Sequence, residues 1–188
     1  MEMPGWIWAA LILGALLLAG LLYQWAGAAL DRRRYPPPGQ VVNGLHIHRR
    51  GERGPWVVLE AGIAASSASW RPVADLLAGE FRVLAYDRAG FGWSAERPAP
   101  RMMSVLVEEL REALDAAGVR EPAYFVGHSF GGLLLRHFCA RYPSRVAGLV
   151  LADPLLPEEW YPGTPEALGR LRRGVKLARR GAVLARVG

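Results

Sequence analysis

Gly127-His128-Ser129-Phe130-Gly131-Gly132 is the stretch of sequence that decides the fold. The apolar residues 123–126 before it predict a short buried strand, and residues 133–142 after it have the length and composition of a helix. A serine between a strand and a helix sits on a sharp turn, where glycine at 127 and 131 lets the neighbouring chain pass without Cβ clashes. We therefore predict that Ser129 is presented at the end of a strand. A glycine-rich turn with an incidental serine is the alternative.

The segments around this turn alternate between strand and helix patterns. Asn43-Gly44 separates two short apolar runs within residues 41–48 and predicts a hairpin. Further strands are expected at 56–60, 81–86 and 146–152, and helices at 69–77 and 105–117, the last with Ser104 as its N-cap. This alternation predicts an α/β fold whose mostly parallel sheet binds ligands at the carboxyl ends of its strands.

The first 30 residues have the composition of a membrane anchor. No charged residue lies between Glu2 and Asp31, and residues 7–22 are almost entirely Leu, Ala, Ile and Gly. Such a segment is long enough to span a bilayer, which takes roughly 20 apolar residues. We predict one transmembrane helix over residues 1–30, in contact with the membrane through residues 5–30.

The charges around this segment predict its orientation. A cleaved signal peptide, with export of the remaining chain, is the alternative to an anchor, and Ala26-Gly27-Ala28 would be its cleavage site. The basic region that precedes the apolar run of a signal peptide is missing, and Arg32-Arg33-Arg34 follows the run instead. By the positive-inside rule, the rest of the single-pass protein lies in the cytoplasm. Residues 31–40 then form a basic, proline-rich linker.

The net charge of +6 has a local origin. Residues 163–188 carry seven Lys or Arg against one Glu, whereas the other 162 residues carry 16 basic and 16 acidic side chains. This distribution argues against nucleic acid as a partner of the whole domain. The single cysteine, Cys139, excludes an internal disulfide framework. We predict neither a metal site nor a cofactor.

Residues 41–160 resemble the α/β-hydrolase fold family, in its bacterial membrane-anchored branch related to prolyl-iminopeptidase-like and haloperoxidase-like enzymes. Three segments carry this resemblance: Leu59-Glu60-Ala61-Gly62-Ile63, then Tyr86-Asp87-Arg88-Ala89-Gly90-Phe91-Gly92-Trp93-Ser94, and the turn around Ser129. The resemblance implies a hydrolase core over residues 41–157. It also implies the start of a cap, with a basic amphipathic helix, over residues 158–188.

The resemblance also implies roles for individual residues. Ser129 would be the nucleophile that attacks an ester, amide or related acyl bond of a small-molecule substrate. Gly127, His128 and Gly131 would shape its turn, the nucleophile elbow of this family. The backbone N–H groups of Ile63 and Phe130 would form the oxyanion hole. Asp87 and Arg88 look catalytic by residue type, but we expect them to stabilise their loop.

The base that such a serine needs is not evident. The family places an acid and then a histidine after the nucleophile, and the four histidines of the chain, His46, His48, His128 and His137, do not suit that role. Asp153 ends the strand after the elbow and is a candidate for the acid, or it only ends that strand and shapes the entry to the cap. We expect a sheet that is incomplete at the C-terminus, with a hydrophobic edge at its sixth strand, and a 188-residue chain that is inactive.

Two other functions stay open. A non-catalytic, membrane-associated binding module would keep this half-hydrolase fold and use the basic helix at residues 166–187 as its contact. A non-hydrolytic member of the fold, such as a cofactor-free haloperoxidase, would share the same elbow. The basic helix itself begins a cap, faces an anionic membrane surface, or is solvated.

Overall fold

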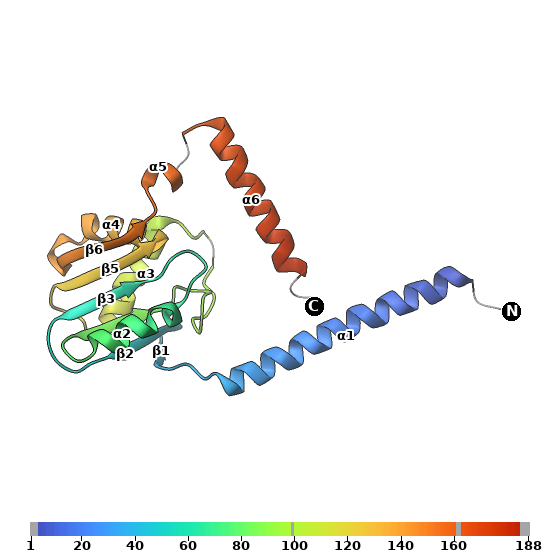
Figure 1. Cartoon of the computed structure of the whole chain (residues 1–188), viewed down its shortest axis with the longest axis horizontal. Coiled ribbons are helices and arrows are strands. Elements are labelled where there is room, and N and C mark those ends of the chain that lie inside the picture. Colours follow the sequence, from blue (N-terminus) through green and yellow to red (C-terminus); the bar gives the residue numbers. More distant parts are fainter. Residues whose placement is uncertain (1–3, 99, 161–162, 185–188) are drawn as a thin grey trace. The chain divides into compact units, whose positions relative to one another are not determined.

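A six-stranded mixed sheet forms the centre of the chain in the computed structural model, which describes residues 4–98, 100–160 and 163–184. Figure 1 shows the strands in the order β1-β2-β4-β3-β5-β6. The strands are β1 (Gln40–Val42), β2 (Leu45–Arg50), β3 (Trp56–Glu60), β4 (Arg82–Tyr86), β5 (Ala123–Ser129) and β6 (Val146–Pro154). β2 is antiparallel to β1 and β4, whereas β3 is parallel to β4 and β5, and β5 to β6. The predicted mostly parallel sheet with flanking helices is confirmed.

The predicted hairpin joins β1 to β2. Both turn residues have positive φ, 51° at Asn43 and 78° at Gly44. These values are typical of the type I′ turn that matches the twist of two antiparallel strands. The hairpin brings β2 against β4, so that the antiparallel edge of the sheet is built from the first residues of the core.

The helices of the core are short. They are α2 (Arg71–Leu77), α3 (Met103–Ala116), α4 (Phe130–Arg141) and α5 (Pro157–Trp160), with 3-10 turns at Ser67–Trp70 and Pro143–Arg145. The prediction of Ser104 as the cap of α3 is wrong. Met102 is the N-cap, because its carbonyl accepts the first hydrogen bonds of the helix, from the N–H groups of Val105 and Leu106.

Helices cover both faces of the sheet. Alternate strand residues point to opposite faces, so Val58, Leu84 and Phe125 pack in one core with α3 and α4. Their neighbours along the strands, with Val57 and Ala85 among them, form a second core with α2. Burial on both faces explains why β3 and β4 are almost wholly apolar.

β6 is an open edge of the sheet among the described residues, since β5 is its one hydrogen-bonded neighbour. Its apolar side chains remain accessible, with 36% of Leu149, 55% of Val150 and 37% of Leu151 exposed. The hydrophobic edge that we expected at the sixth strand is therefore present in this part of the chain. Such an edge is a template for further strand pairing.

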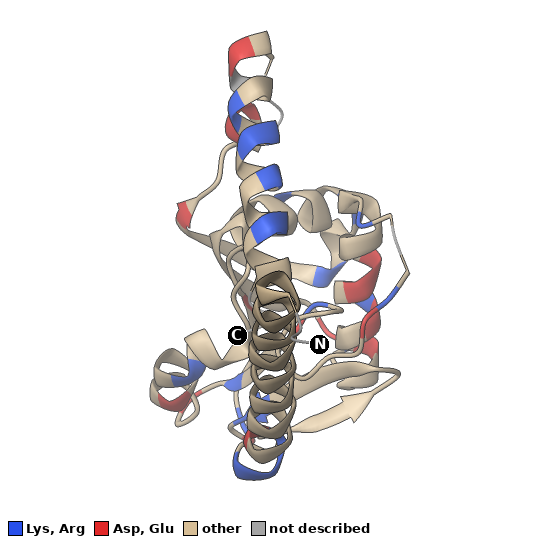
Figure 2. Ribbon diagram, turned by 90° about the vertical axis from the view of Figure 1, so that its right-hand side faces the viewer, with Lys and Arg blue, Asp and Glu red and all other residues tan. Residues whose placement is uncertain are grey.

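Two long helices lie outside the compact unit Pro37–Tyr161, and each is described by itself. α1 (Gly5–Arg34) reaches a mean hydropathy of 2.2, has no buried residue, and is long and apolar enough to cross a membrane. Figure 2 shows it uncharged along most of its length. α6 (Pro165–Leu184) is the predicted basic helix, whose last expected residues, 185–187, lie outside the described ones.

Candidate active site

Ser129 occupies a strained turn between strand and helix. It is the last residue of β5, and α4 begins at Phe130. Its backbone has φ 52° and ψ −120°, a conformation that costs a non-glycine residue on the order of 1–3 kcal/mol. The structure therefore contains the strand–turn–helix geometry that the sequence predicts, with the strain located at the serine itself.

Glycines allow the chain to pass closely on both sides of Ser129. A Cβ on Gly131 would lie 2.5 Å from the carbonyl oxygen of Glu60, and one on Gly127 would lie 2.8 Å from the backbone of Gly131. Real Cβ atoms do not approach backbone this closely, so both positions require glycine. Gly132 is equally constrained, because its Cβ would lie 2.8 Å from the side chain of Pro154 on β6. The sequence pattern gave no reason for this third glycine.

The loop after β3, residues 61–66, reaches the serine. β3 pairs directly with β5, and a Cβ on Gly62 would lie 3.6 Å from Cβ of Ser129 and 3.1 Å from Nδ1 of His128. Ala64 has φ 55°, which makes the turn unusually tight. The N–H of Ile63 donates no hydrogen bond among the described residues. The two backbone donors that we predict for the oxyanion hole, those of Ile63 and Phe130, thus belong to segments that meet at Ser129.

Arg88 fixes this loop from below. Its Nη1 donates to the carbonyl oxygen of Ala61 at 2.7 Å and its Nη2 donates to that of Gly62 at 2.5 Å, while Nη1 also contacts the carboxylate of Glu60. Its guanidinium carbon lies 5.5 Å from the ring centre of Phe130. One buried cation therefore holds three consecutive residues of the loop and contacts the residue after the serine.

The buried charges keep Arg88 ionised. Burial alone lowers the pKa of Arg88, but the negative charge of Glu60 outweighs it and raises the pKa above its ordinary value. Burial raises the pKa of Glu60, and the nearby Arg88 offsets part of that rise. Both side chains are almost fully buried, so neither exchanges its partner for water.

Asp87 connects the loops after β3 and β4. Its carboxylate accepts hydrogen bonds from the N–H of Ser67 at 2.6 Å and of Trp93 at 3.0 Å, and lies 2.9 Å from Nδ1 of His46. Burial raises the pKa of Asp87, but the hydrogen bonds from His46, Ser67 and Trp93 outweigh it and lower the pKa. The structural role that we predict for Asp87 and Arg88 is confirmed by these contacts.

No histidine hydrogen-bonds to Ser129 among the described residues. His46 and His48 are buried on β2, three strand spacings from β5, which is roughly 14 Å. His137 is exposed on α4 and lines a groove between α3 and α4. His128 lies against Gly62, beside the serine.

Asp153 lies next to Ser129 at the carboxyl edge of the sheet. The register of β5 and β6 jumps from His128 opposite Ala152 to Ser129 opposite Pro154, which leaves Asp153 as an extra residue. It is exposed and has φ 45°. Its side chain makes no hydrogen bond or ion pair within the described part of the chain. Asp153 therefore faces solvent close to the serine, and its assignment as the acid stays a prediction.

Backbone strain gathers at this edge. The described residues contain four non-glycine residues with positive φ, and three of them, Ala64, Ser129 and Asp153, lie in or after β3, β5 and β6. Such residues cluster at functional sites, because only a surrounding structure that over-determines the conformation can hold it.

An apolar hollow of about 410 Å³ adjoins the elbow. Met102, Met103, Leu106, Phe130 and Trp160 contribute to its walls. The rings of Phe130 and Trp160 lie 4.8 Å apart. The hollow has room for an apolar part of a small molecule beside the serine. Sequence analysis missed Trp160, because no local pattern indicates that a residue after β6 returns to the elbow.

No group of three or more His, Cys, Asp or Glu side chains is placed to hold a metal ion in the described residues. The chemistry available at this edge is that of a serine, backbone N–H groups and a carboxylate.

A profile described as the alpha/beta hydrolase fold matches residues 55–184, more than half of the chain. The chain belongs to the α/β hydrolase fold family. Its expected membrane-anchored branch is not identified by this match.

Relatives of this α/β hydrolase include proteins with enzyme names. It is 38% identical to the uncharacterized protein YqjL of Bacillus subtilis over 58% of this chain and 43% of YqjL. It is 39% identical to lipase LipV of Mycobacterium tuberculosis over 61% of this chain and 43% of LipV. A thermophilic esterase from Thermogutta terrifontis superposes with a TM-score of 0.63 at 29% identity, over 72% of this chain and 48% of the esterase. The chain thus spans less than half the length of these proteins.

Proposed function

We propose that Ser129 is the nucleophile of a serine hydrolase that cleaves an ester, amide or related acyl bond of a small molecule. The observation that carries the proposal is the strained backbone of Ser129 between β5 and α4, directly opposite the loop after β3. The family membership and the names of LipV and the Thermogutta esterase support hydrolysis as the reaction class.

The geometry suits a two-step acyl transfer. Oγ of Ser129 attacks the acyl carbon, and the carbonyl oxygen takes the negative charge. The N–H groups of Ile63 and Phe130 stabilise that charge, aided by the N-terminal end of α4. The leaving group departs with a proton delivered by a base, and water then releases the acid from the serine.

The proton transfers need a histidine held by an acid. We propose Asp153 for the acid, since it is the carboxylate that β6 places beside Ser129. We also propose that the 188 residues alone are inactive or nearly so, because general-base assistance contributes about 10²–10⁴-fold to the rate and no described histidine bonds to Ser129.

We place this hydrolase at a membrane. α1 provides the span through residues 5–30, and Arg32, Arg33 and Arg34 at its end put the catalytic domain on the cytoplasmic side by the positive-inside rule.

The test is covalent labelling by a fluorophosphonate, whose phosphorus is attacked by an activated serine with loss of fluoride. Membranes from the source cell are labelled and digested, and the peptide that contains Ser129 is analysed by mass spectrometry. We expect the adduct on Ser129 and its loss in Ser129→Ala, whereas Ser144→Ala, an exposed serine remote from the elbow, keeps it.

The same reagent tests the inactivity of the 188-residue chain. The purified chain should label at least about 100-fold more slowly than the native protein. Absence of the adduct from native protein, in membranes where other serine hydrolases are labelled, would favour the non-catalytic binding module.

A further inference from the structure

α6 presents an apolar stripe that nothing in the helix itself covers. Leu168, Leu171, Val175, Ala178 and Ala182 recur at spacings of three and four residues, so they lie on one face of the helix. The three largest of them, Leu168, Leu171 and Val175, are between 40% and 46% exposed. The stripe is too narrow for a helix buried on all sides, and it is continuous over the length of α6.

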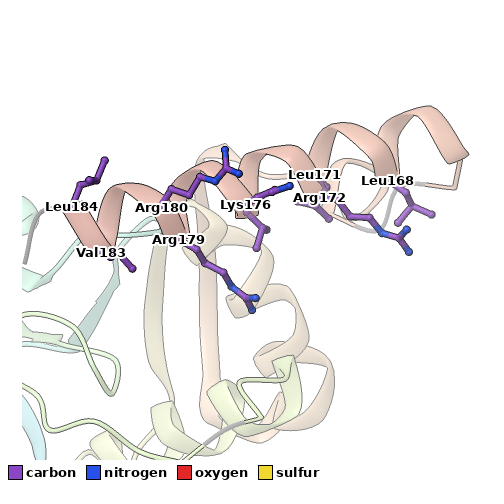
Figure 3. A pocket seen from close by; sticks show the side chains of 9 residues that line it. Leu168, Leu171, Arg172, Lys176, Arg179, Arg180, Val183 and Leu184 are labelled. Carbon is purple, nitrogen blue, oxygen red and sulfur yellow. The ribbon is translucent and has the colours of Figure 1, made fainter.

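Cations border the stripe. Arg172, Lys176 and Arg179 follow one another at helical spacing along its margin, and α6 carries six Lys or Arg against the single Glu166. Figure 2 shows these basic residues recurring along the helix. A hollow of about 870 Å³ is lined by α6 residues alone, apolar and cationic together, as Figure 3 shows.

α6 is weak as a free helix. Gly169, Gly174 and Gly181 each disfavour it relative to alanine. No ion pair among the described residues links its cations to an acid. A helix of this composition is expected to form most fully when a surface covers its apolar stripe.

We infer that α6 lies on the surface of an anionic lipid bilayer, with its stripe at the boundary of headgroups and acyl chains and its cations on lipid phosphates. A large apolar moment, low overall hydrophobicity and a Lys/Arg-rich polar face are the features of interfacial helices. The long stems of Arg and Lys let the charged ends reach the headgroups while the stripe is buried.

Charge complementarity selects this occupant. A nucleic acid would satisfy the cations and leave the leucines in water, whereas an apolar protein groove would cover the leucines and leave six cations unpaired. An anionic bilayer satisfies both. The bilayer is supplied if α1 spans it, so the inference rests on the membrane part of the proposed function. It does not depend on the chemistry of Ser129.

The test uses the full chain with Cys139→Ser and Val175→Cys, labelled at the new thiol with the fluorophore NBD. The protein is reconstituted into vesicles of phosphatidylcholine with or without phosphatidylglycerol. We expect a blue-shifted emission, protected from a water-soluble quencher, only with phosphatidylglycerol. The matched control is Leu177→Cys, which lies about 200° around the helix from Val175 and should remain quenched.

Charge variants test the electrostatic part. Arg172→Gln with Arg179→Gln should raise the fraction of quenched probe at position 175 by about tenfold, since each cation near an anionic surface contributes to binding. Arg120→Gln with Arg136→Gln, which removes the same charge from exposed positions of the core, should change nothing.

Two results would overturn the inference. A probe at position 175 that stays quenched in anionic vesicles, in a chain that floats with those vesicles, contradicts it while leaving the anchor intact. A probe that is protected equally in both vesicle types shows that another protein surface covers α6. A chain that does not float with vesicles overturns the anchor and the inference together, and labelling of Ser129 is read separately.

Discussion

The two sides of Ser129 are built very differently. On the side of β3 and β4, Arg88 and Asp87 hold the neighbouring loops through buried hydrogen bonds to Ala61, Gly62 and Ser67. On the side of β6, Asp153 is exposed, and the backbone contact to the serine is one hydrogen bond from the N–H of Leu155 to the carbonyl oxygen of Ser129.

This difference shows which part of the site the chain organises by itself. The nucleophile and the predicted oxyanion loop are held by interactions within β3, β4 and β5, so their geometry is set before any substrate binds. The position of the proposed acid lacks such support among the described residues. Four variants test this contrast.

Arg88→Met should have the largest effect on stability. The change removes the cation that pairs with Glu60 and leaves a buried carboxylate and two loop carbonyls without a donor. We expect the free energy of unfolding to fall by about 3–5 kcal/mol, measured by denaturant titration of the detergent-solubilised chain.

Arg97→Gln is the control, because Arg97 pairs with Glu112 at a partly exposed site. It should cost less than about 1 kcal/mol. Equal losses in the two variants would show that the Arg88 cluster is no stronger than a surface ion pair.

Gly131→Ala should cost somewhat less, about 2–3 kcal/mol. The added Cβ would meet the carbonyl oxygens of Glu60 and Ala61 at 2.5 and 2.7 Å, which forces β3 and the elbow apart. Gly79→Ala, where a Cβ meets no atom within 4 Å, is the matched control and should change the unfolding midpoint little. Similar midpoints for the two variants would show that the close approach is not required.

Asp87→Asn should change how stability depends on pH. The pKa of Asp87 is lowered in the folded chain, so its contribution is present above the ordinary value of 3.8 and is lost as the pH falls through the folded pKa. Unfolding titrations should show a steeper acid loss for the native sequence than for the variant, which at pH 7 is weaker by about 1–2 kcal/mol. Parallel pH profiles would exclude this role.

Asp153→Asn should have the smallest effect. Asn tolerates the positive φ at this position, and the carboxylate has no partner within the described residues. The free energy of unfolding should stay within about 0.5 kcal/mol of the native value. A loss comparable to that of Arg88→Met would mean that the two sides of Ser129 are supported alike.

The features that the sequence predicts correctly depend on neighbouring residues. The turn at Asn43-Gly44 and the glycines around Ser129 are local, since a few consecutive residues determine each backbone conformation. The cap of α3 failed for a related reason. Ser104 is a common capping residue, but the helix begins earlier, after Met102.

The features that sequence reasoning missed depend on contacts between distant residues. Arg88 reaches Ala61 and Gly62, 27 and 26 positions earlier in the chain. Trp160 returns to Phe130 across β6 and the turn that follows it. No periodicity within one sequence encodes such pairs, so the general fold and the nucleophile were predictable whereas the support of the site was not.

The open edge at β6 predicts an uneven pattern of amide hydrogen exchange. In a parallel ladder, alternate N–H groups of a strand point to each of its two neighbours. β5 is the one neighbour of β6 among the described residues, so every second amide of β6 faces away from the sheet. Those amides should exchange with deuterium quickly while the amides between them, and those of the central strands β3 and β5, exchange only on larger opening. An alternation from one residue to the next would thus mark where the sheet is able to accept another strand.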